Sequence, residues 1–491
     1  MKFNLFISGL LLGGSALTAS SVELPDSVYH YEASAQAVVS TGEQTPFWLV
    51  NNRKGLSSID KSNGYVRAGF FKEFQYDRRF SWEAGVDLVV PWNYTSKFVV
   101  QQLYAGIRYR SLSFMIGQKE WENGVTDPEL SSGDMFISQN ARPVPQGRLE
   151  MKEFQKVPFT KNWLAVRGYI SFGMFDDWRW ERSWTGGHNK WAEHVLYHTK
   201  GGFLRIGNEE KLPVTLDAGL EMGCQFGGTL HRADGEIIKF PAGLKGFWKA
   251  LFPQGGGDSD DPNQSGDISN IYGNQLGQWS FALNYDDKNV PWKARLYYEH
   301  FFEDHSQMFF DHAWKDMLLG LQVTPPKNPV VSEFVYEYIV TKDQSGSVYW
   351  DKTPEIPDQI SGTDNYYNHN YPGWQNWGMG IGNPLLISPI YNKDHILQFF
   401  HNRIKGHHFG WKGNPTDEID YRVLLTLTRS WGTYGRPTDN ILHNFNGLLE
   451  VGYRPHQLPG WQLRVAIAGD AGKLLGKSFG AMFTISKSGW L

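Results

Sequence analysis

The sequence predicts an all-β fold, an antiparallel transmembrane β-barrel, from three observations. Stretches of alternating side chains go out, turn and come back along the chain. Aromatic residues make up 15% of the 491 residues, yet the mean hydropathy is -0.44. Tight turns alternate with long connections, which is typical of outer-membrane barrels. Such a barrel needs no long apolar run, because only every second residue of a strand meets lipid, and aromatic girdles at its two interfaces would account for the many Trp and Tyr residues.

The clearest strand pairs lie in residues 64–90 and 101–119. In the first pair, Val66 and Phe70 share one parity and Arg67 has the other. A period of two indicates a strand, because successive Cβ atoms point to opposite faces. An apolar face opposite a charged or small face fits either a half-buried sheet or a wall between lipid and a wet lumen.

The same pattern recurs to the end of the chain, and no linker or fixed repeat divides it, so we expect one domain over residues 22–491. Long loops should lie outside the cell in such a barrel. The further strands are expected at 163–175, 201–207, 214–228, 278–286, 292–302, 317–324, 330–342, 420–431, 445–454, 461–470 and 477–487, with long loops at 120–160, 176–199, 229–276 and 343–396.

The first 21 residues are typical of a secretory signal peptide, with Lys2, an apolar stretch and then small residues. The only cysteine is Cys224, so no intrachain disulfide is possible. A formal net charge of -4 without a cluster of Lys and Arg gives no reason to expect nucleic acid as a partner.

One long loop carries a helical pattern, with apolar residues at i, i+3, i+4, i+7 and i+8. We expect this helix to pack on or into the barrel, with a helix lying in the membrane as the alternative. The residues are Leu244, Phe247, Trp248, Leu251 and Phe252.

Two other loops are unusually aromatic, and we expect them to bind polysaccharide. Aromatic rings cover the flat C–H faces of sugars, while Asn, Asp and Arg satisfy the hydroxyls at their edges. The alternatives are an interface girdle or a loop packed on itself. The candidate residues are Trp178, Trp180, Trp184 and Trp191 in the first loop and Tyr366, Tyr367, Tyr371, Trp374 and Trp377 in the second.

The sequence shows no motif for catalysis, a metal or a cofactor. It has no Gly-x-Ser-x-Gly elbow, no His-Glu-x-x-His pair and no dinucleotide fingerprint. We therefore expect a protein that is not an enzyme and that needs neither metal nor cofactor.

Several phrases are more specific than periodicity. They are TPFWLVNNR at 45–53, LSSG at 130–133, NARPVPQ at 140–146, GNQLG at 273–277, GNPL at 382–385 and NRIKGHH at 402–408. Together, and in this order, they resemble the Wzi capsule-assembly family in its Bacteroides-like form. The resemblance implies a barrel of about 18 strands in the outer membrane of a Gram-negative bacterium, closed by its own loops.

The resemblance also implies a function, that of a lectin-like surface protein that helps capsular polysaccharide attach to or assemble on the cell. Its partners would be capsular polysaccharide, outer-membrane lipid and other capsule-export components. Enteric members add a periplasmic helical bundle, and no clear bundle lies between the signal peptide and the strand at Tyr65.

The phrase at 140–146 is constrained to an extended form, because proline fixes φ and restricts the residue before it. We expect this segment to plug the lumen through Asn140, Arg142, Gln146 and Arg148, with Arg142 and Arg148 paired to acidic wall residues.

Two other functions remain open for the protein as a whole. A porin or substrate-specific channel with the same wall is the first alternative, and a barrel enzyme acting on surface lipid or glycan is the second.

Overall fold

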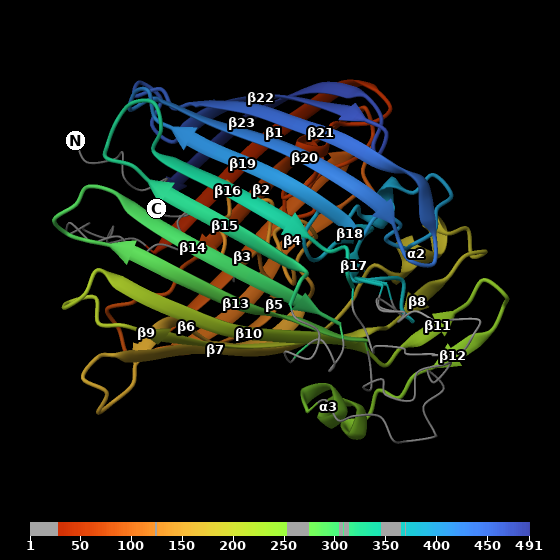
Figure 1. The fold of residues 1–491 in the computed structure, drawn as a ribbon, viewed down its shortest axis with the longest axis horizontal. Coiled ribbons are helices and arrows are strands. Elements are labelled where there is room, and N and C mark those ends of the chain that lie inside the picture. The colour runs from red at the N-terminus through yellow and green to blue at the C-terminus, as the bar shows by residue number, and fades with distance from the viewer. Residues whose placement is uncertain are drawn as a thin grey trace, which may run out of the picture.

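The computed structural model is a closed barrel of 18 antiparallel strands (Figure 1). It describes residues 28–122, 125–252, 274–303, 308, 314–344, 365–368 and 370–491. The first strand closes the ring, because β1 pairs with β2 from Tyr29↔Lys72 onward and with β23 from His30↔Trp490 onward. The expected fold class is therefore confirmed, and the expected signal peptide lies outside the described residues.

The barrel strands follow one another around the ring in chain order. They are β1 (Tyr29–Gly42), β2 (Ser62–Lys72), β3 (Phe80–Trp92), β4 (Val99–Tyr109), β5 (Leu112–Gln118), β6 (Gln146–Lys156), β7 (Leu164–Met174), β9 (Leu196–Ile206), β10 (Val214–Phe226), β13 (Asn274–Asp286), β14 (Lys293–Phe302), β15 (Met317–Thr324), β16 (Glu333–Val340), β19 (Ile404–Gly413), β20 (Ile419–Gly432), β21 (Pro437–Tyr453), β22 (Trp461–Gly472) and β23 (Ser478–Trp490).

Short elements lie between these strands. They are the helices α1 (Phe47–Val50), α2 (Trp178–Trp184) and α3 (Leu244–Leu251), the 3-10 turn Pro389–Tyr391, and the strands β8 (Trp191–Glu193), β11 (Thr229–His231), β12 (Ile237–Lys239), β17 (Gln375–Asn376) and β18 (Met379–Gly380). Within the described residues, no helix is both long and apolar enough to cross a bilayer.

Three barrel strands, β1, β6 and β19, were not among the expected ones. In the middle of β1 the outward positions Ala33, Ala35 and Ala37 are all alanine, so the apolar parity is weak. The β6 strand carries charges on both faces and shifts register against β7 between Met151 and Gln155. The expected loop over 120–160 therefore ends at β6, which is part of the wall.

The wall exposes apolar side chains and buries charged ones, which is the reverse of the arrangement in a soluble protein. On β2, Val66 is 58% exposed and Phe70 is 45% exposed, while on β3 Asp87 is fully buried and Glu83 is 4% exposed. Apolar side chains cover the outside and charged side chains line the inside. Only lipid is a favourable solvent for such an outer surface, so the wall divides lipid from a polar lumen.

The two ends of the barrel differ (Figure 1). At the end that holds β1's first residue and β23's last, the connections are short, such as Arg110–Ser111 between β4 and β5. At the opposite end lie α2, α3 and the small sheet of β8, β11 and β12. Outer-membrane barrels keep short turns in the periplasm and long loops outside, so we call this second end the outer end.

The hydrophobic core lies inside the lumen and is built from outer-end loops. We call these loops the plug, which comprises residues 43–61, 125–145, 365–368 and 370–403. Its fully buried side chains include Trp48, Phe136 and Trp374, and they belong to one apolar cluster with inward wall residues such as Tyr297. The barrel is therefore filled by its own chain at this level.

The wall holds the plug by accepting its backbone N–H groups. Glu337 on β16 accepts hydrogen bonds from the Ser132 amide at 2.7 Å and from the Ser131 hydroxyl. Glu299 on β14 accepts one from the Met135 amide at 2.9 Å. These bonds satisfy irregular buried backbone that would otherwise be costly.

A charge on the outer face should destabilise the barrel according to its depth. We expect Val86→Lys, in the middle of β3, to lower the free energy of unfolding in lipid vesicles by about 2–4 kcal/mol. The control is Phe80→Lys on the same face at the strand's end, where the cost should be about 0–1 kcal/mol. Equal small effects on denaturant-unfolding curves would contradict a lipid-facing β3.

Loosening the plug should open the barrel to ions. We expect the intact protein to show little conductance in planar bilayers and Glu337→Ala to show open events, because Ser131, Ser132 and Tyr297 lose their acceptor. Glu209→Ala, exposed at the short-turn end, is the control, and gel mobility with and without heating verifies assembly. A large steady conductance of the unaltered protein would exclude a sealed lumen.

Candidate functional site

The strongest candidate site lies at the outer end, where α2 meets the part of the plug around β17. Asp177 accepts a hydrogen bond from the Trp377 amide at 2.8 Å, and Asp176 accepts one from the Trp377 indole at 3.1 Å. Glu181 accepts from Gln375 Nε2 at 2.6 Å on one oxygen and from the Ala192 amide at 2.9 Å on the other. Two loops almost 200 residues apart are thus joined by carboxyl groups.

A row of stacked side chains crosses this junction. From the rim inward, His395 stacks on Trp184 with ring centroids 4.3 Å apart, Trp184 stacks on Trp180 at 5.5 Å, and Trp180 lies 6.2 Å from Trp377. The Arg142 guanidinium completes the row 4.6 Å from the Trp377 ring centroid. We call these five side chains the aromatic row.

The row has exposed and buried members, so only part of it can meet a ligand. Trp184 and Trp377 are half-buried and His395 is exposed, whereas Trp180 is 9% exposed. Trp180 packs in an apolar cluster with residues such as Ile390, which fixes the row on the plug. The arrangement offers flat ring faces beside polar groups, as saccharide binding requires.

The other two tryptophans of the first loop have different positions. Trp178 is half-buried and lies 5.4 Å from the His194 ring. Trp191 is 6% exposed and stacks on His231 at 3.8 Å, where it joins β8 to β11. Trp178 therefore keeps a face for a ligand, and Trp191 mainly holds the small outer sheet together.

Four of the five aromatic candidates in the second loop are core residues. Tyr366, Tyr367 and Trp374 are fully buried and Tyr371 is 2% exposed. Their polar atoms bond inside the protein; for example, the Trp374 indole donates to the Phe136 carbonyl at 2.9 Å. Direct contact with a saccharide does not fit these four, because no ring face reaches the surface. Of these five residues only Trp377 is partly exposed, and its contact with polysaccharide stays a prediction.

The residues expected in the plug divide between plug and wall. Asn140 joins plug segments by accepting from the Asn52 amide and donating to the Gly380 carbonyl. Gln146 and Arg148 belong to β6, and Arg148 pairs with the wall residue Glu150 at 2.7 Å.

The expected pairing of Arg142 with an acidic wall residue is wrong. Its guanidinium donates to the Gly55 carbonyl and to the hydroxyls of Thr95 and Ser96. Burial lowers its pKa to about 10, although Asp176 nearby opposes that shift. Arg142 therefore stays charged at neutral pH and supports Trp377 from beneath.

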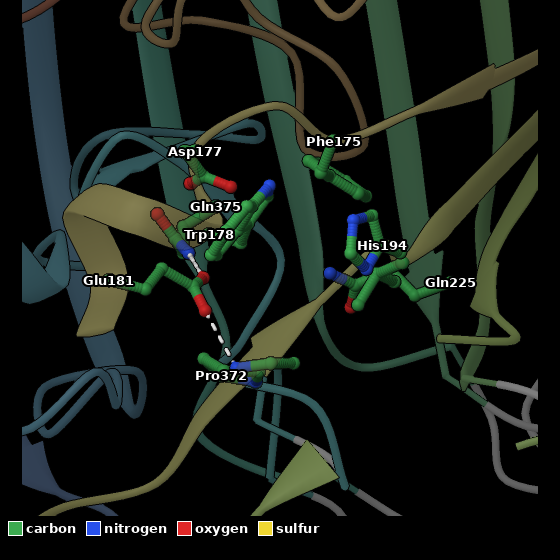
Figure 2. A pocket seen from close by; sticks show the side chains of 10 residues that line it. Phe175, Asp177, Trp178, Glu181, His194, Gln225, Pro372 and Gln375 are labelled. Atoms are coloured by element: carbon green, nitrogen blue, oxygen red, sulfur yellow. Dashed lines mark hydrogen bonds between the residues drawn. The ribbon is translucent and has the colours of Figure 1, made fainter. Parts of the chain in front are cut away.

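A recess of about 250 Å³ lies beside the junction. Figure 2 shows Glu181 and Gln375 on one side of it, joined by a hydrogen bond, and His194 and Gln225 on the other. That volume includes open space at the mouth of the recess, and only about 10 Å³ of it admits the centre of a water-sized sphere, which is room for about one water molecule. The recess is therefore too small for a sugar unit, and a saccharide bound at this end would have to lie across the rim.

The carboxyl groups of the junction bind protons unusually tightly. Burial, together with the charge of the neighbouring Asp176, raises the pKa of Asp177 to about 7. Burial and the charge of Asp177 raise the pKa of Glu181 well above its ordinary value. Among the described residues, no three His, Cys, Asp or Glu side chains are arranged to bind a metal ion.

Sequence reasoning located Trp178, Trp184, Trp377 and Arg142 but missed His194 and His395. Each of these histidines contacts a tryptophan of α2, and His395 lies about 200 residues further along the chain. No local pattern around it could have indicated this contact.

The junction should loosen as pH rises. A carboxyl whose pKa is raised in the folded state stabilises that state fully below its ordinary pKa, and the stabilisation is lost as pH passes the raised value. For Asp177 this window runs from about 4 to about 7. We expect hydrogen exchange of the Trp377 amide, corrected for its intrinsic rate, to be less protected at pH 8 than at pH 5.

In Asp177→Asn that pH dependence should be much reduced, because the amide oxygen accepts the same bond without titrating. The Trp374 amide, which donates to the Tyr367 carbonyl, is the internal control. A pH dependence that is the same in both proteins would show that Asp177 is not its source.

The fold is similar to those of solved outer-membrane proteins. No family model and no curated protein sequence matches the chain. A solved structure from Escherichia coli is similar over 95% of this chain and 85% of its own, at 13% identity and a TM-score of 0.58. It is described as Wzi, an outer-membrane protein involved in group 1 capsule assembly and a carbohydrate-binding β-barrel.

Other similar structures are outer-membrane proteins of further species. OccK3 from Pseudomonas aeruginosa has 10% identity and a TM-score of 0.46, covering 94% of this chain and 96% of its own. OccAB2 from Acinetobacter baumannii has 7% identity and a TM-score of 0.48, covering 94% and 98%. At these identities, the likeness to Wzi shows the fold alone, and that fold is a Wzi-like outer-membrane β-barrel.

Proposed function

We propose that this protein is a non-enzymatic, lectin-like barrel of the Wzi type in a Gram-negative outer membrane. Its outer end binds capsular polysaccharide and helps it attach to or assemble on the cell surface. The observation that carries the proposal is the aromatic row, which presents half-exposed rings of Trp184 and Trp377 at the rim of a plugged barrel. The carbohydrate binding described for the similar Wzi structure supports the same class of ligand.

Polar groups around the row suit the edges of a sugar. Asp176 is exposed beside Trp377, and Asn189 on the same loop is half-buried and donates to the Asp394 carbonyl. Arg182 is exposed on α2. Rings bind the apolar face of a pyranose and these groups bind its hydroxyls, so each sugar unit can be held without a deep pocket.

The plug favours attachment over transport. Its backbone is bonded to Glu299 and Glu337 of the wall, and its apolar core fills the lumen. A channel for solutes would have to break these bonds, whereas a surface lectin keeps them. Other capsule-export components are proposed partners that would meet the same outer end.

Removing both half-exposed rings of the row should weaken polysaccharide binding. We expect Trp184→Ala with Trp377→Ala to lower affinity on a glycan array roughly 30- to 150-fold, because each covered ring contributes about 1–1.5 kcal/mol. In cells the same protein should release capsule into the medium. The matched control is Trp292→Ala, an exposed tryptophan at the short-turn end.

Assembly is checked by gel mobility with and without heating, so that loss of folding is not mistaken for loss of binding. If the double variant assembles and holds capsule as the unaltered protein does, the aromatic row is not the binding surface. Sugar-dependent block of a conductance would instead favour the channel.

A further inference from the structure

The helix α3 lies on the outside of the barrel, against the wall that faces lipid. Its Phe247 ring lies 5.1 Å from Phe172 on β7 and 5.4 Å from Phe226 on β10. Cys224 on β10 is fully buried in the same cluster. Phe172, Cys224 and Phe226 have the outward parity of their strands, opposite to inward residues such as Glu221. Figure 1 shows α3 beside the outer ends of these strands.

The helix covers polar side chains that the wall would otherwise present to lipid. On β9, His198 and Lys200 have the outward parity, opposite to the inward Tyr197. His198 is fully buried and stacks on Phe172 at 4.2 Å. The Lys200 ammonium donates to the carbonyl of Leu251, the last residue of α3. A cation is favourable at a helix C-terminus, so Lys200 is satisfied there instead of facing hydrocarbon.

A second loop also covers an outward polar residue of the wall. Trp314 stacks on the outward His300 of β14 at 4.8 Å, and the His300 Nδ1 atom bonds to the Asp316 carbonyl. Lys200 and His300, which face outward near the outer end, are therefore each covered by residues of a loop. Below them the outward residues are apolar, as at Leu216 on β10, which is 38% exposed. The covered residues mark the upper edge of the apolar band.

The side of α3 that faces away from the wall is apolar. Trp248 is 62% exposed and Phe252, directly after the helix, is 56% exposed. Their rings stack on each other with centroids 5.6 Å apart and an interplanar angle of 12°. Two large rings held side by side form an exposed apolar patch on a helix that packs on the lipid-facing wall, and water is an unfavourable solvent for this patch.

We propose that α3 is an interfacial helix, which inserts Trp248 and Phe252 among the acyl chains of the outer leaflet while its other face packs on β7, β9 and β10. Tryptophan prefers this depth, where its ring meets hydrocarbon and its N–H meets the polar layer. An amphipathic helix lying in the membrane plane needs one apolar face for lipid. Because its opposite face packs on the wall, α3 widens the barrel's contact with lipid on this side.

This role extends the lipid-facing surface beyond the strands. It is independent of the polysaccharide site, because α2 and the aromatic row contribute no residue to the cluster under α3. The lipid contact would remain if the outer end bound no glycan.

Spin labels test the depth of α3 in reconstituted phospholipid vesicles. We place one label at Trp248→Cys and, in a second protein, at Phe252→Cys, and measure collisions with oxygen, which enters lipid, and with a water-soluble nickel complex. Cys224 is fully buried, so it should stay unlabelled, and the unaltered protein verifies this. Leu216→Cys on the outer wall is the lipid reference, and Lys393→Cys, 87% exposed at the rim, is the water reference.

We expect both labels to match the lipid reference, with oxygen accessibility at least several-fold higher relative to nickel than at Lys393→Cys. Accessibility equal to the water reference at both positions would overturn the proposal. Gel mobility with and without heating verifies that each labelled barrel is folded. Because Trp248 and Phe252 are exposed, their replacement leaves the packing on Phe172 and Phe226 in place.

Discussion

The structure depends on carboxyl groups of the wall that accept hydrogen bonds from the backbone of the plug. Glu337 on β16 and Glu299 on β14 receive the amides of Ser132 and Met135, and Gln278 on β13, which pairs with β14, receives the amide of Phe136 at 2.9 Å. An irregular segment can be buried only if its N–H groups find acceptors, and a β-barrel wall has none to spare in its own ladder. The side chains of three strands supply them, so wall and plug determine each other's positions.

The hydrogen bonds between wall and plug also determine where the residues of the aromatic row lie. The plug segment that leaves Phe136 continues to Asn140 and Arg142, and Arg142 lies beneath Trp377. Trp374, three residues before Trp377, stacks on Phe136 at 5.7 Å. The half-buried Trp377 ring is thus supported by Arg142, and Trp374 is held on Phe136, whose amide is bonded to the wall. A rigid ring face loses little entropy when a sugar binds it, which favours a shallow lectin site.

The strands were predictable from sequence because lipid on one side and a polar lumen on the other impose a strict parity, as Val66 and Asp87 illustrate. The alternation of side chains did not reveal strands whose outward residues are small, as along β1, or whose two faces both carry charges, as along β6. The candidate site was only half predictable. Aromatic enrichment marked both loops, but it could not distinguish Trp374, fully buried, from Trp377, half-buried. That difference arises from contacts with Phe136 and Arg142, more than 200 residues away, which no local pattern contains.

Loops from the outer end cover polar residues on both the inner and the outer side of the wall. Inside, polar groups such as Glu337 are covered by the plug, and outside, the Lys200 ammonium is covered by α3. In each case a loop returns from the outer end to satisfy a group that neither lipid nor bulk water reaches. Loops used in this way cannot move without exposing the group beneath them. The loop residues that cover these groups therefore form a fixed surface, and a fixed surface with half-exposed tryptophans suits a role in holding a polymer better than one in passing solutes.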